Sequence, residues 1–245
     1  MTAHRILLLG GTAEARALAA HLVDLDVQVV SSLAGRVARP RMPVGPVRVG
    51  GFGGVEGLCR VLTDFDAVVD ATHPFAVSIS QNAIAACAMT GRPLLRLQRP
   101  GWSQRSSPSW HWVDTHHDAA NLAAQLGDRP VLTIGRQQLA WFIPALSDKS
   151  VLARVVDDPD VEIPRGWRLR NDRGPYELAG ELKLLREHRA DVLVTKDSGG
   201  EYTWPKMAAA GELGLPVVIV RRPPIPASSA QVSTVEAARD WVHAL

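Results

Sequence analysis

Polar and glycine-rich segments suited to nucleotide binding follow several apolar runs of this chain. The first is Gly10-Gly-Thr-Ala-Glu14, which opens a helix-forming stretch. Glycines let the backbone approach a diphosphate, and the amides and dipole of a helix N-terminus favour an anion. The segment departs from the GxGxxG pattern, because Thr12 and Ala15 take the second and third glycine positions. A diphosphate-binding turn and an ordinary strand–helix turn therefore both remain open.

A serine pair and an arginine follow the second apolar run, in Ser31-Ser-Leu-Ala-Gly-Arg36. NAD-binding proteins usually place an acid here to hold the ribose hydroxyls, whereas a nearby arginine suits the 2′-phosphate of NADP. This segment contains no acid, so it favours NADP with Arg36 near the phosphate; a solvated loop arginine is the alternative. The next segment, Gly50-Gly-Phe-Gly-Gly54, predicts a close approach of backbone and ligand, because such glycine density lowers stability.

Two further segments carry side chains that could move protons or bind anions. Thr72-His-Pro-Phe-Ala76 follows an apolar run, and its His73 is either a proton donor or a neighbour that caps a helix. In Thr195-Lys-Asp-Ser-Gly-Gly200, the ammonium of Lys196 and the backbone amides are suited to hold an anion. A buried ion pair is the alternative for this second segment.

Two patterns that look chemical are discounted. Tyr202 and Lys206 have the YxxxK spacing of short-chain dehydrogenases, but Pro205 interrupts the helix that this chemistry needs. The three histidines within residues 111–117 have no cysteines or paired acids at metal-ligand spacing. We therefore expect no metal site.

The segments that must position these residues occur twice along the chain. The opening run, Arg5-Ile-Leu-Leu-Leu-Gly10, matches Pro130-Val-Leu-Thr-Ile-Gly135 at an offset of 125 residues. A later run, Gly91-Arg-Pro-Leu-Leu-Arg-Leu-Gln-Arg99-Pro100, is echoed at an offset of 123 residues by the run that ends in Arg222-Pro223. The chain therefore divides into two similar halves, residues 1–126 and 127–245.

Each half alternates apolar runs with helix-forming stretches. In the first half the runs are 6–9, 27–33, 47–49, 67–71 and 94–97, and the helical stretches are 13–23, 55–62 and 78–89. Continuous apolar runs indicate strands buried on both faces of a parallel sheet. We predict an α/β protein of two similar Rossmann-like domains with parallel sheets and a ligand cleft between them. Because Arg136 stands where the first half has Gly11, only the first half is expected to bind a dinucleotide.

Composition limits the remaining possibilities. The 245 residues carry a formal net charge of +2, with acidic residues interspersed, so nucleic acid is not an expected partner. No apolar run is long enough to span a bilayer, and the N-terminus does not read as a signal peptide. Two cysteines exclude a disulfide framework and favour the cytoplasm. Of 27 basic residues only four are lysine; this arginine excess reflects either an anionic ligand or a compositional bias.

Several segments together resemble the family of precorrin-6A and cobalt-precorrin-6A reductases, which are NADPH-dependent enzymes of cobalamin biosynthesis. The two most specific are Asp70-Ala-Thr-His-Pro-Phe-Ala76 and Thr195-Lys-Asp-Ser-Gly-Gly200. The others are Gly10-Gly-Thr-Ala-Glu14, Ser32-Leu-Ala-Gly-Arg36, Gly51-Phe-Gly-Gly-Val-Glu-Gly57, Arg99-Pro-Gly-Trp102 and Arg173-Gly-Pro-Tyr176. They span nearly the whole chain in the family's order.

The resemblance implies that NADPH reduces one double bond of the precorrin-6A macrocycle, giving precorrin-6B. The substrate is a polycarboxylate tetrapyrrole, with or without cobalt, and transient contacts with neighbouring pathway enzymes stay open. The N-terminal domain would bind NADPH through Gly10, Gly11, Thr12, Glu14, Ser32, Gly35, Arg36, Gly53, Thr72, His73 and Pro74. The C-terminal domain would bind the macrocycle through Arg136, Tyr176, Lys196, Asp197, Ser198, Gly199, Gly200 and Lys206. His73 and Lys196 are the candidate catalytic side chains, although cofactor and ring carry most of the chemistry and no such side chain is obligatory.

Two rival functions remain from the residues alone. One is a two-domain protein that binds an anionic ligand without chemistry, and it predicts ligand binding without NADPH oxidation. The other is a transferase acting on a nucleotide-linked substrate, and it predicts preference for a nucleotide other than NADPH.

Overall fold

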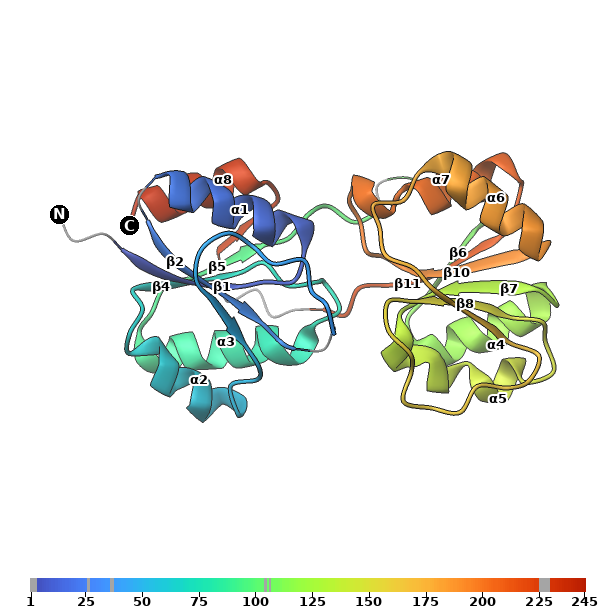
Figure 1. Ribbon diagram of the computed structural model, residues 1–245, viewed down its shortest axis with the longest axis horizontal. Helices are drawn as coiled ribbons and strands as arrows, with labels where there is room; N and C mark the ends of the chain where they lie inside the picture. The colour runs from blue at the N-terminus through green and yellow to red at the C-terminus, as the bar shows by residue number, and fades with distance from the viewer. Residues whose placement is uncertain (1–3, 26, 36–37, 104, 106, 225–229) are drawn as a thin grey trace. The chain divides into compact units, whose positions relative to one another are not determined.

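The computed structural model describes residues 4–25, 27–35, 38–103, 105, 107–224 and 230–245. Within these residues the chain forms two compact units, each built on a six-stranded parallel sheet with helices on both faces (Figure 1). The prediction of two similar Rossmann-like domains with parallel sheets is confirmed.

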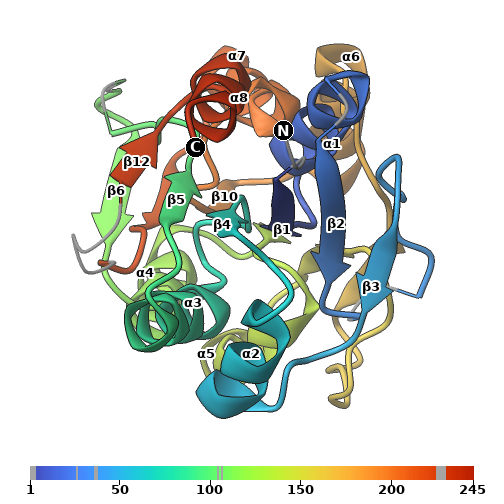
Figure 2. The same cartoon turned by 90° about the vertical axis from the view of Figure 1, so that its left-hand side faces the viewer.

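The sheet of unit 1 has the order β12-β5-β4-β1-β2-β3. Its strands are β1 (Arg5–Leu9), β2 (Gln28–Leu33), β3 (Val47–Val49), β4 (Ala67–Asp70), β5 (Leu94–Leu97) and β12 (Ala230–Val232). One face is covered by α1 (Ala13–Asp24) and α8 (Val235–His243), and the other by α2 (Gly54–Leu62) and α3 (Val77–Thr90) (Figure 2).

The sheet of unit 2 repeats this order as β6-β11-β10-β7-β8-β9. Its strands are β6 (Trp110–Val113), β7 (Pro130–Thr133), β8 (Leu152–Val155), β9 (Arg168–Asn171), β10 (Val192–Lys196) and β11 (Val217–Val220). One face carries α4 (His116–Leu126), the 3-10 helix η1 (Arg136–Trp141) and α5 (Ile143–Leu146). The other carries α6 (Leu178–His188), the 3-10 turn η2 (Glu201–Thr203) and α7 (Pro205–Glu212).

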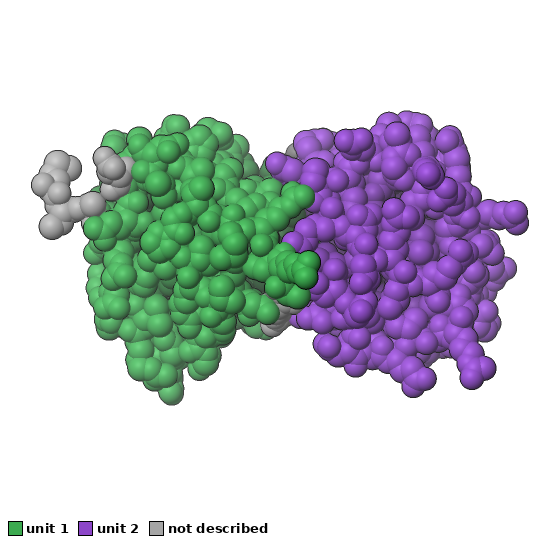
Figure 3. Space-filling model, viewed as in Figure 1, with its two compact units in different colours: residues 1–100, 223–245 green, residues 101–222 purple. Residues whose placement is uncertain are grey.

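The two units exchange their sixth strands. β6 follows β5 in the sequence but pairs with β11, whereas β12, near the C-terminus, pairs with β5. The compact units are consequently residues 1–100 with 223–245 and residues 101–222 (Figure 3). This division differs from the predicted one at residues 126 and 127, because β6 and α4 belong to unit 2 and β12 and α8 belong to unit 1.

The continuous apolar run of β1 is explained by burial on both faces of the sheet. Ile6 and Leu8 pack with residues of α1 and α8, whereas Leu7 and Leu9 pack with residues of α2 and α3. All four side chains are at most 1% exposed. Alternating burial toward two helical layers is the reason that the strand shows no polar face in the sequence.

Two expectations from composition concern membranes and disulfides. No helix in the described part of the chain is long and apolar enough to cross a membrane. Both cysteines, Cys59 and Cys87, are free thiols. Burial raises the pKa of the Cys87 thiol to about 12, so this group behaves as a small apolar side chain.

Candidate functional site

The carboxyl ends of β1 and β4 are adjacent in unit 1, where Leu9 is in register with Asp70. From β1 the chain turns into α1 on one face, and from β4 it turns toward α3 on the other. The hydroxyl of Thr12 donates a 2.8 Å hydrogen bond to the carbonyl oxygen of Ala71 and thereby joins the two turns. The same hydroxyl accepts from the amide of Ala15 at 3.1 Å and caps α1. This edge is the topological switch point at which doubly wound folds bind their ligands.

The turn between β1 and α1 exposes its backbone. Gly11 has a φ of +111°, a conformation that favours glycine, and a Cβ added there would meet no atom within 4 Å. The amide of Gly10 donates to the carbonyl oxygen of Ser32 at 2.9 Å, which fixes the turn against β2. A fixed turn with an open backbone at a helix N-terminus fits the close approach of an anion.

Glu14, in the first turn of α1, forms an ion pair with Arg99. The guanidinium Nη1 lies 2.7 Å from the carboxylate, and the two side chains are 14% and 20% exposed. Arg99 thus balances an acid that would otherwise repel a phosphate at this helix end. A pocket in unit 1 is lined by Thr12, Glu14, Ala71, Thr72, Pro74, Leu97, Gln98 and Arg99.

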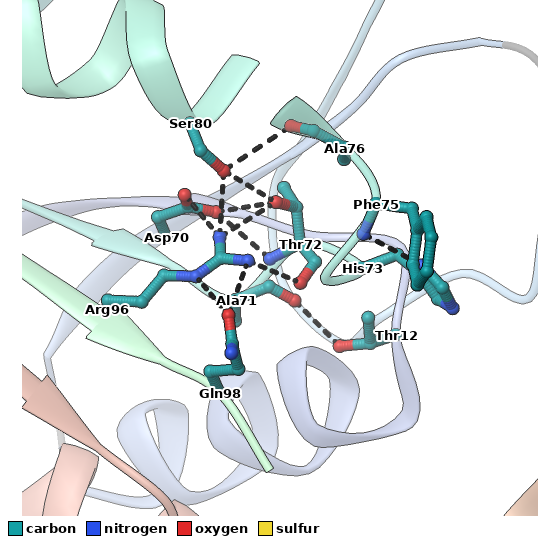
Figure 4. A network of polar contacts seen from close by, with 10 residues as sticks. All are labelled: Thr12, Asp70, Ala71, Thr72, His73, Phe75, Ala76, Ser80, Arg96 and Gln98. Atoms are coloured by element: carbon teal, nitrogen blue, oxygen red, sulfur yellow. Dashed lines mark hydrogen bonds and ion pairs between the residues drawn. The ribbon is translucent and has the colours of Figure 1, made fainter. Parts of the chain in front are cut away.

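A buried polar network supports the loop that follows β4 (Figure 4). Asp70 and Arg96 form an ion pair, and each residue is at most 3% exposed. The Asp70 carboxylate accepts from the amide of Thr72 at 3.0 Å and from its hydroxyl at 2.7 Å. Arg96 also donates to Thr72 Oγ1 at 3.0 Å and to Ser80 Oγ at 2.9 Å. Thr72 is therefore held by both members of the ion pair.

His73 lies in the turn that leads into α3 and contacts its backbone. Its Nδ1 accepts a 3.2 Å hydrogen bond from the amide of Phe75, and the two rings lie 5.8 Å apart (Figure 4). The N-cap residue of α3 is Ala76, and no side chain accepts a capping hydrogen bond there. A role in proton transfer stays a prediction.

Ser31 and Ser32 lie in β2 and are 2% and 6% exposed. Gly35 follows with a φ of +72°, and a Cβ there would lie 3.3 Å from a methyl group of Val49. Arg36, the expected ligand of a 2′-phosphate, lies outside the described residues.

The glycine-rich segment after β3 is held by Arg48. Its guanidinium donates to the carbonyl oxygens of Gly50 and Gly51, each at 2.8 Å, and lies 4.0 Å from the ring centroid of Phe52. Gly53 is the N-cap residue directly before α2, with a φ of +77°, and a Cβ there would meet no atom within 4 Å. This segment therefore also presents open backbone at the carboxyl edge of the sheet.

In unit 2 the corresponding edge lies after β7 and β10. Arg136 opens η1 and donates to the carbonyl oxygen of Asp158 at 2.9 Å. A Cβ at Gly135 would lie 3.8 Å from Nζ of Lys196. Burial lowers the pKa of Lys196 to about 8, and burial together with the charge of Lys196 lowers the pKa of His116 to about 4.

For the loop of residues 195–200, a buried ion pair was the alternative to anion binding. Asp197 forms such a pair. Its carboxylate lies 3.4 Å from Nε of Arg222 and accepts from the amide of Trp102 at 2.8 Å. The loop continues through Ser198 to Gly199 and Gly200, whose φ angles are +64° and +69°.

Lys206 and Tyr176 are held by internal contacts. Nζ of Lys206 donates to the carbonyl oxygen of Thr203 at 3.0 Å and lies 5.0 Å from the ring centroid of Trp102. The Tyr176 ring lies 4.0 Å from the guanidinium of Arg154, which forms a buried ion pair with Glu181. Burial raises the pKa of the Tyr176 hydroxyl, which donates to a backbone carbonyl at 3.3 Å.

The discounted patterns have separate positions. Tyr202 lies in η2, and Pro205 begins the helix that carries Lys206, so the YxxxK residues do not share one helix. Among the described residues, no three or more His, Cys, Asp or Glu side chains form a group that could hold a metal ion.

Several arginines of these networks were not assigned from the sequence, among them Arg96, Arg99 and Arg222. Arg96 interrupts the apolar run Leu94–Leu97, and a lone cation in a buried strand is a signal for an ion pair. Arg99 and Arg222 are equivalent in the internal repeat, and each pairs with an acid of its own unit. For Arg99 and Arg222, the available signal was that the two arginines occupy equivalent positions in the repeats.

The fold and the loops at the carboxyl ends of its strands define the class of protein. It is a two-domain α/β protein in which both domains have the strand order of dinucleotide-binding folds. Residues 5–243 match the model of the family described as Precorrin-6x reductase CbiJ/CobK. The chain belongs to this family, as the resemblance implied, and is thereby an oxidoreductase of cobalamin biosynthesis.

Relatives support this membership over the full length. The chain is 52% identical to a precorrin-6A reductase of Rhodococcus erythropolis over 244 residues, covering 98% of each chain. It is 49% identical to a precorrin-6A reductase of Mycobacterium tuberculosis over 245 residues, again covering 98% of each. A solved structure titled CobK precorrin-6A reductase superposes with a TM-score of 0.89 at 38% identity, covering 98% of this chain and 96% of the other.

Proposed function

We propose that the chain reduces one double bond of precorrin-6A with NADPH and yields precorrin-6B. Reduction of precorrin-6A is the activity by which its relatives are named. NADPH as the reductant, and the residues that hold it, are our assignment. The observation that supports it best is the joined pair of turns at Thr12 and Ala71, which leaves the backbone of Gly11 open at the switch point of unit 1.

The residues of unit 1 fit a dinucleotide. Gly10, Gly11 and Thr12 would hold the diphosphate at the N-terminus of α1, where amides and dipole favour an anion. Thr72 and Pro74 line the same pocket and would face the nicotinamide. NADPH supplies a hydride when bound, so the protein must orient the cofactor and keep its ribose and phosphates in place.

The adenosine end of the cofactor is assigned to the segments after β2 and β3. Ser32, Gly35 and Arg36 would bind the ribose and its 2′-phosphate, and Gly53 would lie beside them. The absence of an acid in residues 31–36 supports NADP over NAD.

Unit 2 is assigned to the macrocycle. The ammonium of Lys196 and the guanidinium of Arg136 would bind acidic side chains of the ring, since the substrate is a polycarboxylate. Ser198, Gly199 and Gly200 would contribute backbone and hydroxyl donors, with Tyr176 and Lys206 at the margin of the site. The predicted ligand cleft between the domains stays a prediction.

Reduction of a ring double bond requires a proton as well as a hydride. His73 and Lys196 are the titratable candidates, and solvent is the alternative. His73→Gln tests His73 as the donor, because loss of a donor lowers kcat while the affinity for the ring is kept. Lys196 is also assigned to substrate binding, so for its uncharged variant kcat is compared at saturating precorrin-6A.

The function is tested by mixing the protein with NADPH and precorrin-6A without oxygen and following nicotinamide absorbance together with the spectrum of the ring. We expect loss of NADPH in proportion to the change in the ring spectrum. Tight binding of the ring without NADPH oxidation would indicate a binding protein instead. Preference for a different nucleotide would indicate a transferase.

A further inference from the structure

Both connections between the units meet unit 2 at one carboxylate. The chain enters unit 2 at Gly101 and leaves it after Arg222. Directly after entry, the amide of Trp102 donates to Asp197 Oδ1 at 2.8 Å. Directly before exit, Nε of Arg222 lies 3.4 Å from Asp197 Oδ2 and donates to the Asp197 carbonyl oxygen at 2.9 Å. Asp197 is 5% exposed, so these contacts are shielded from solvent.

The entering connection has no freedom to shift at this point. A Cβ at Gly101 would lie 2.5 Å from Asp197 Oδ2, so only glycine fits against the carboxylate. The next side chain, Trp102, is 2% exposed and packs in the core of unit 2, with its ring 6.2 Å from that of Trp204. The connection is thus fixed both by the carboxylate and by the core.

Asp197 also belongs to the loop that we assign to the substrate. Its amide donates to the carbonyl oxygen of Val220 at 2.9 Å, which ties the loop to β11. Lys196 and Ser198 are its immediate neighbours. Because the carboxylate holds the backbone between these two residues, a shift of Asp197 moves both of them.

We propose that Asp197 is a positioning residue, which fastens both connections of unit 2 to the loop that binds the macrocycle. This inference rests on the proposed function, because it takes residues 196–200 as a substrate loop. It also accounts for an acid in a loop that receives a polycarboxylate. Arg222 balances the charge of Asp197, and a buried charge needs such a partner.

The chain contains a matched control in the same sheet. It lies at the amino ends of the strands, whereas Asp197 lies at their carboxyl ends. Asp191 directly precedes β10 and accepts from the amides of Asp128 at 2.7 Å and Arg129 at 2.9 Å. A Cβ at Gly127 would overlap the Asp191 carboxylate, as one at Gly101 would crowd Asp197. Asp191 and Gly127 therefore also place a carboxylate that accepts from backbone amides against a glycine, but at the amino ends of the strands, away from the loop.

The test compares Asp197→Asn and Gly101→Ala with Asp191→Asn and Gly127→Ala in the full chain. For the Asp197 and Gly101 variants, we expect KM for precorrin-6A to rise about tenfold, because small displacements of binding groups are costly. Their Kd for NADPH stays at the wild-type value. For the control variants, we expect a lower Tm with KM for precorrin-6A unchanged. If Gly101→Ala does not fold, Asp197→Asn alone decides.

An Asp197→Asn variant that lowers only Tm would overturn the proposal, and so would an equal rise in KM for both aspartate variants. Failure of the wild type to oxidise NADPH would instead refute the proposed function. Hydrogen exchange then decides about Asp197: we expect Asp197→Asn to raise deuterium uptake together in the peptides that carry Trp102 and Lys196, and Asp191→Asn to raise it in neither. Increased uptake in only one of the two peptides would overturn the positioning role.

Discussion

The hydroxyl of Thr12 donates a hydrogen bond to the carbonyl oxygen of Ala71 at 2.8 Å, joining the turns that follow β1 and β4. One side chain therefore both caps α1 and fixes its distance from the loop after β4. Since these turns line one pocket, a single hydroxyl sets the geometry of the site that we assign to the cofactor.

Replacing Thr12 by valine removes both contacts without changing the shape of the side chain. Loss of the helix cap costs about 1 kcal/mol of the free energy of unfolding. Because the two turns are no longer joined, we also expect weaker NADPH binding. Urea denaturation and a fluorescence titration measure the two effects. Thr12→Ser keeps the hydroxyl and is the control; a serine variant as impaired as the valine variant would contradict this role.

The buried ion pair of Arg96 and Asp70 predicts strong coupling between the two residues. Arg96→Met leaves an unpaired buried carboxylate, so we expect a loss of about 3–5 kcal/mol in the free energy of unfolding. Combining it with Asp70→Asn recovers part of that loss, because the orphaned charge is gone. A double-mutant cycle by urea denaturation gives the coupling energy. Additive losses would show that the two side chains act independently.

Lys196 predicts a pH dependence of substrate binding. Its pKa of about 8 means that the ammonium is present below this pH and is lost above it. We expect KM for precorrin-6A to rise as the pH passes above about 8. In Lys196→Arg this rise disappears, because the guanidinium stays charged. The measurement is KM across the pH range in both proteins, and the same rise in both would assign the titration to another group.

The lowered pKa of Lys196 also predicts that the free energy of unfolding rises with pH, whereas substrate binding weakens. The folded pKa lies below the ordinary value of 10.5, so folding disfavours the charged form. This cost is fully present below pH 8 and is relieved as the pH rises toward 10.5. At neutral pH, Lys196→Met should therefore raise the free energy of unfolding by roughly 2 kcal/mol, less than the full shift implies because the side chain keeps some solvent contact. A less stable variant would contradict the assigned burial cost.

The exchanged strands predict which part of the chain folds alone. Residues 101–222 contain every strand of the second sheet, including β6. We expect this fragment to unfold cooperatively on heating. Residues 127–245 lack β6 and carry β12 without its partner β5, so we expect no cooperative transition. Circular dichroism of the two fragments makes the comparison, and the reverse result would contradict the strand exchange.

Arg36 predicts discrimination between the two nicotinamide cofactors. Arg36→Ala should weaken NADPH binding much more than NADH binding, because only NADPH carries the 2′-phosphate. Arg41→Ala removes a charge from the same segment and is the control. Kd values for both cofactors are measured by titration. An equal loss for NADPH and NADH would remove the phosphate assignment.

The positions of the strands could be predicted from the sequence, but the sheet that β6 and β12 join could not. Runs such as 47–49 and 94–97 became β3 and β5 with the same bounds, because strands buried on both faces carry a continuous apolar signal. The exchange of β6 and β12 could not be predicted, because the repeat makes these strands equivalent and pairing between distant segments leaves no local signal.

The candidate site could likewise be predicted only in part: the loops that form it were expected, but the pairing of its side chains was not. Strand-end loops such as Thr72-His73 were predicted from position alone, and the structure places Thr72 in a network with Arg96. Which side chain would pair with Glu14 or Asp197 depended on long-range packing. Residues far apart in sequence, such as Glu14 and Arg99, come together only when the sheet forms.

Transfer of deuterium from labelled NADPH tests the central claim most directly. The protein is incubated with precorrin-6A and NADPH that carries deuterium at the hydride-donating carbon, and the product is analysed by mass spectrometry. We predict a single deuterium in the reduced macrocycle when the label occupies one face of the nicotinamide, and none when it occupies the other. A reduced product without deuterium from either form would contradict hydride transfer from NADPH.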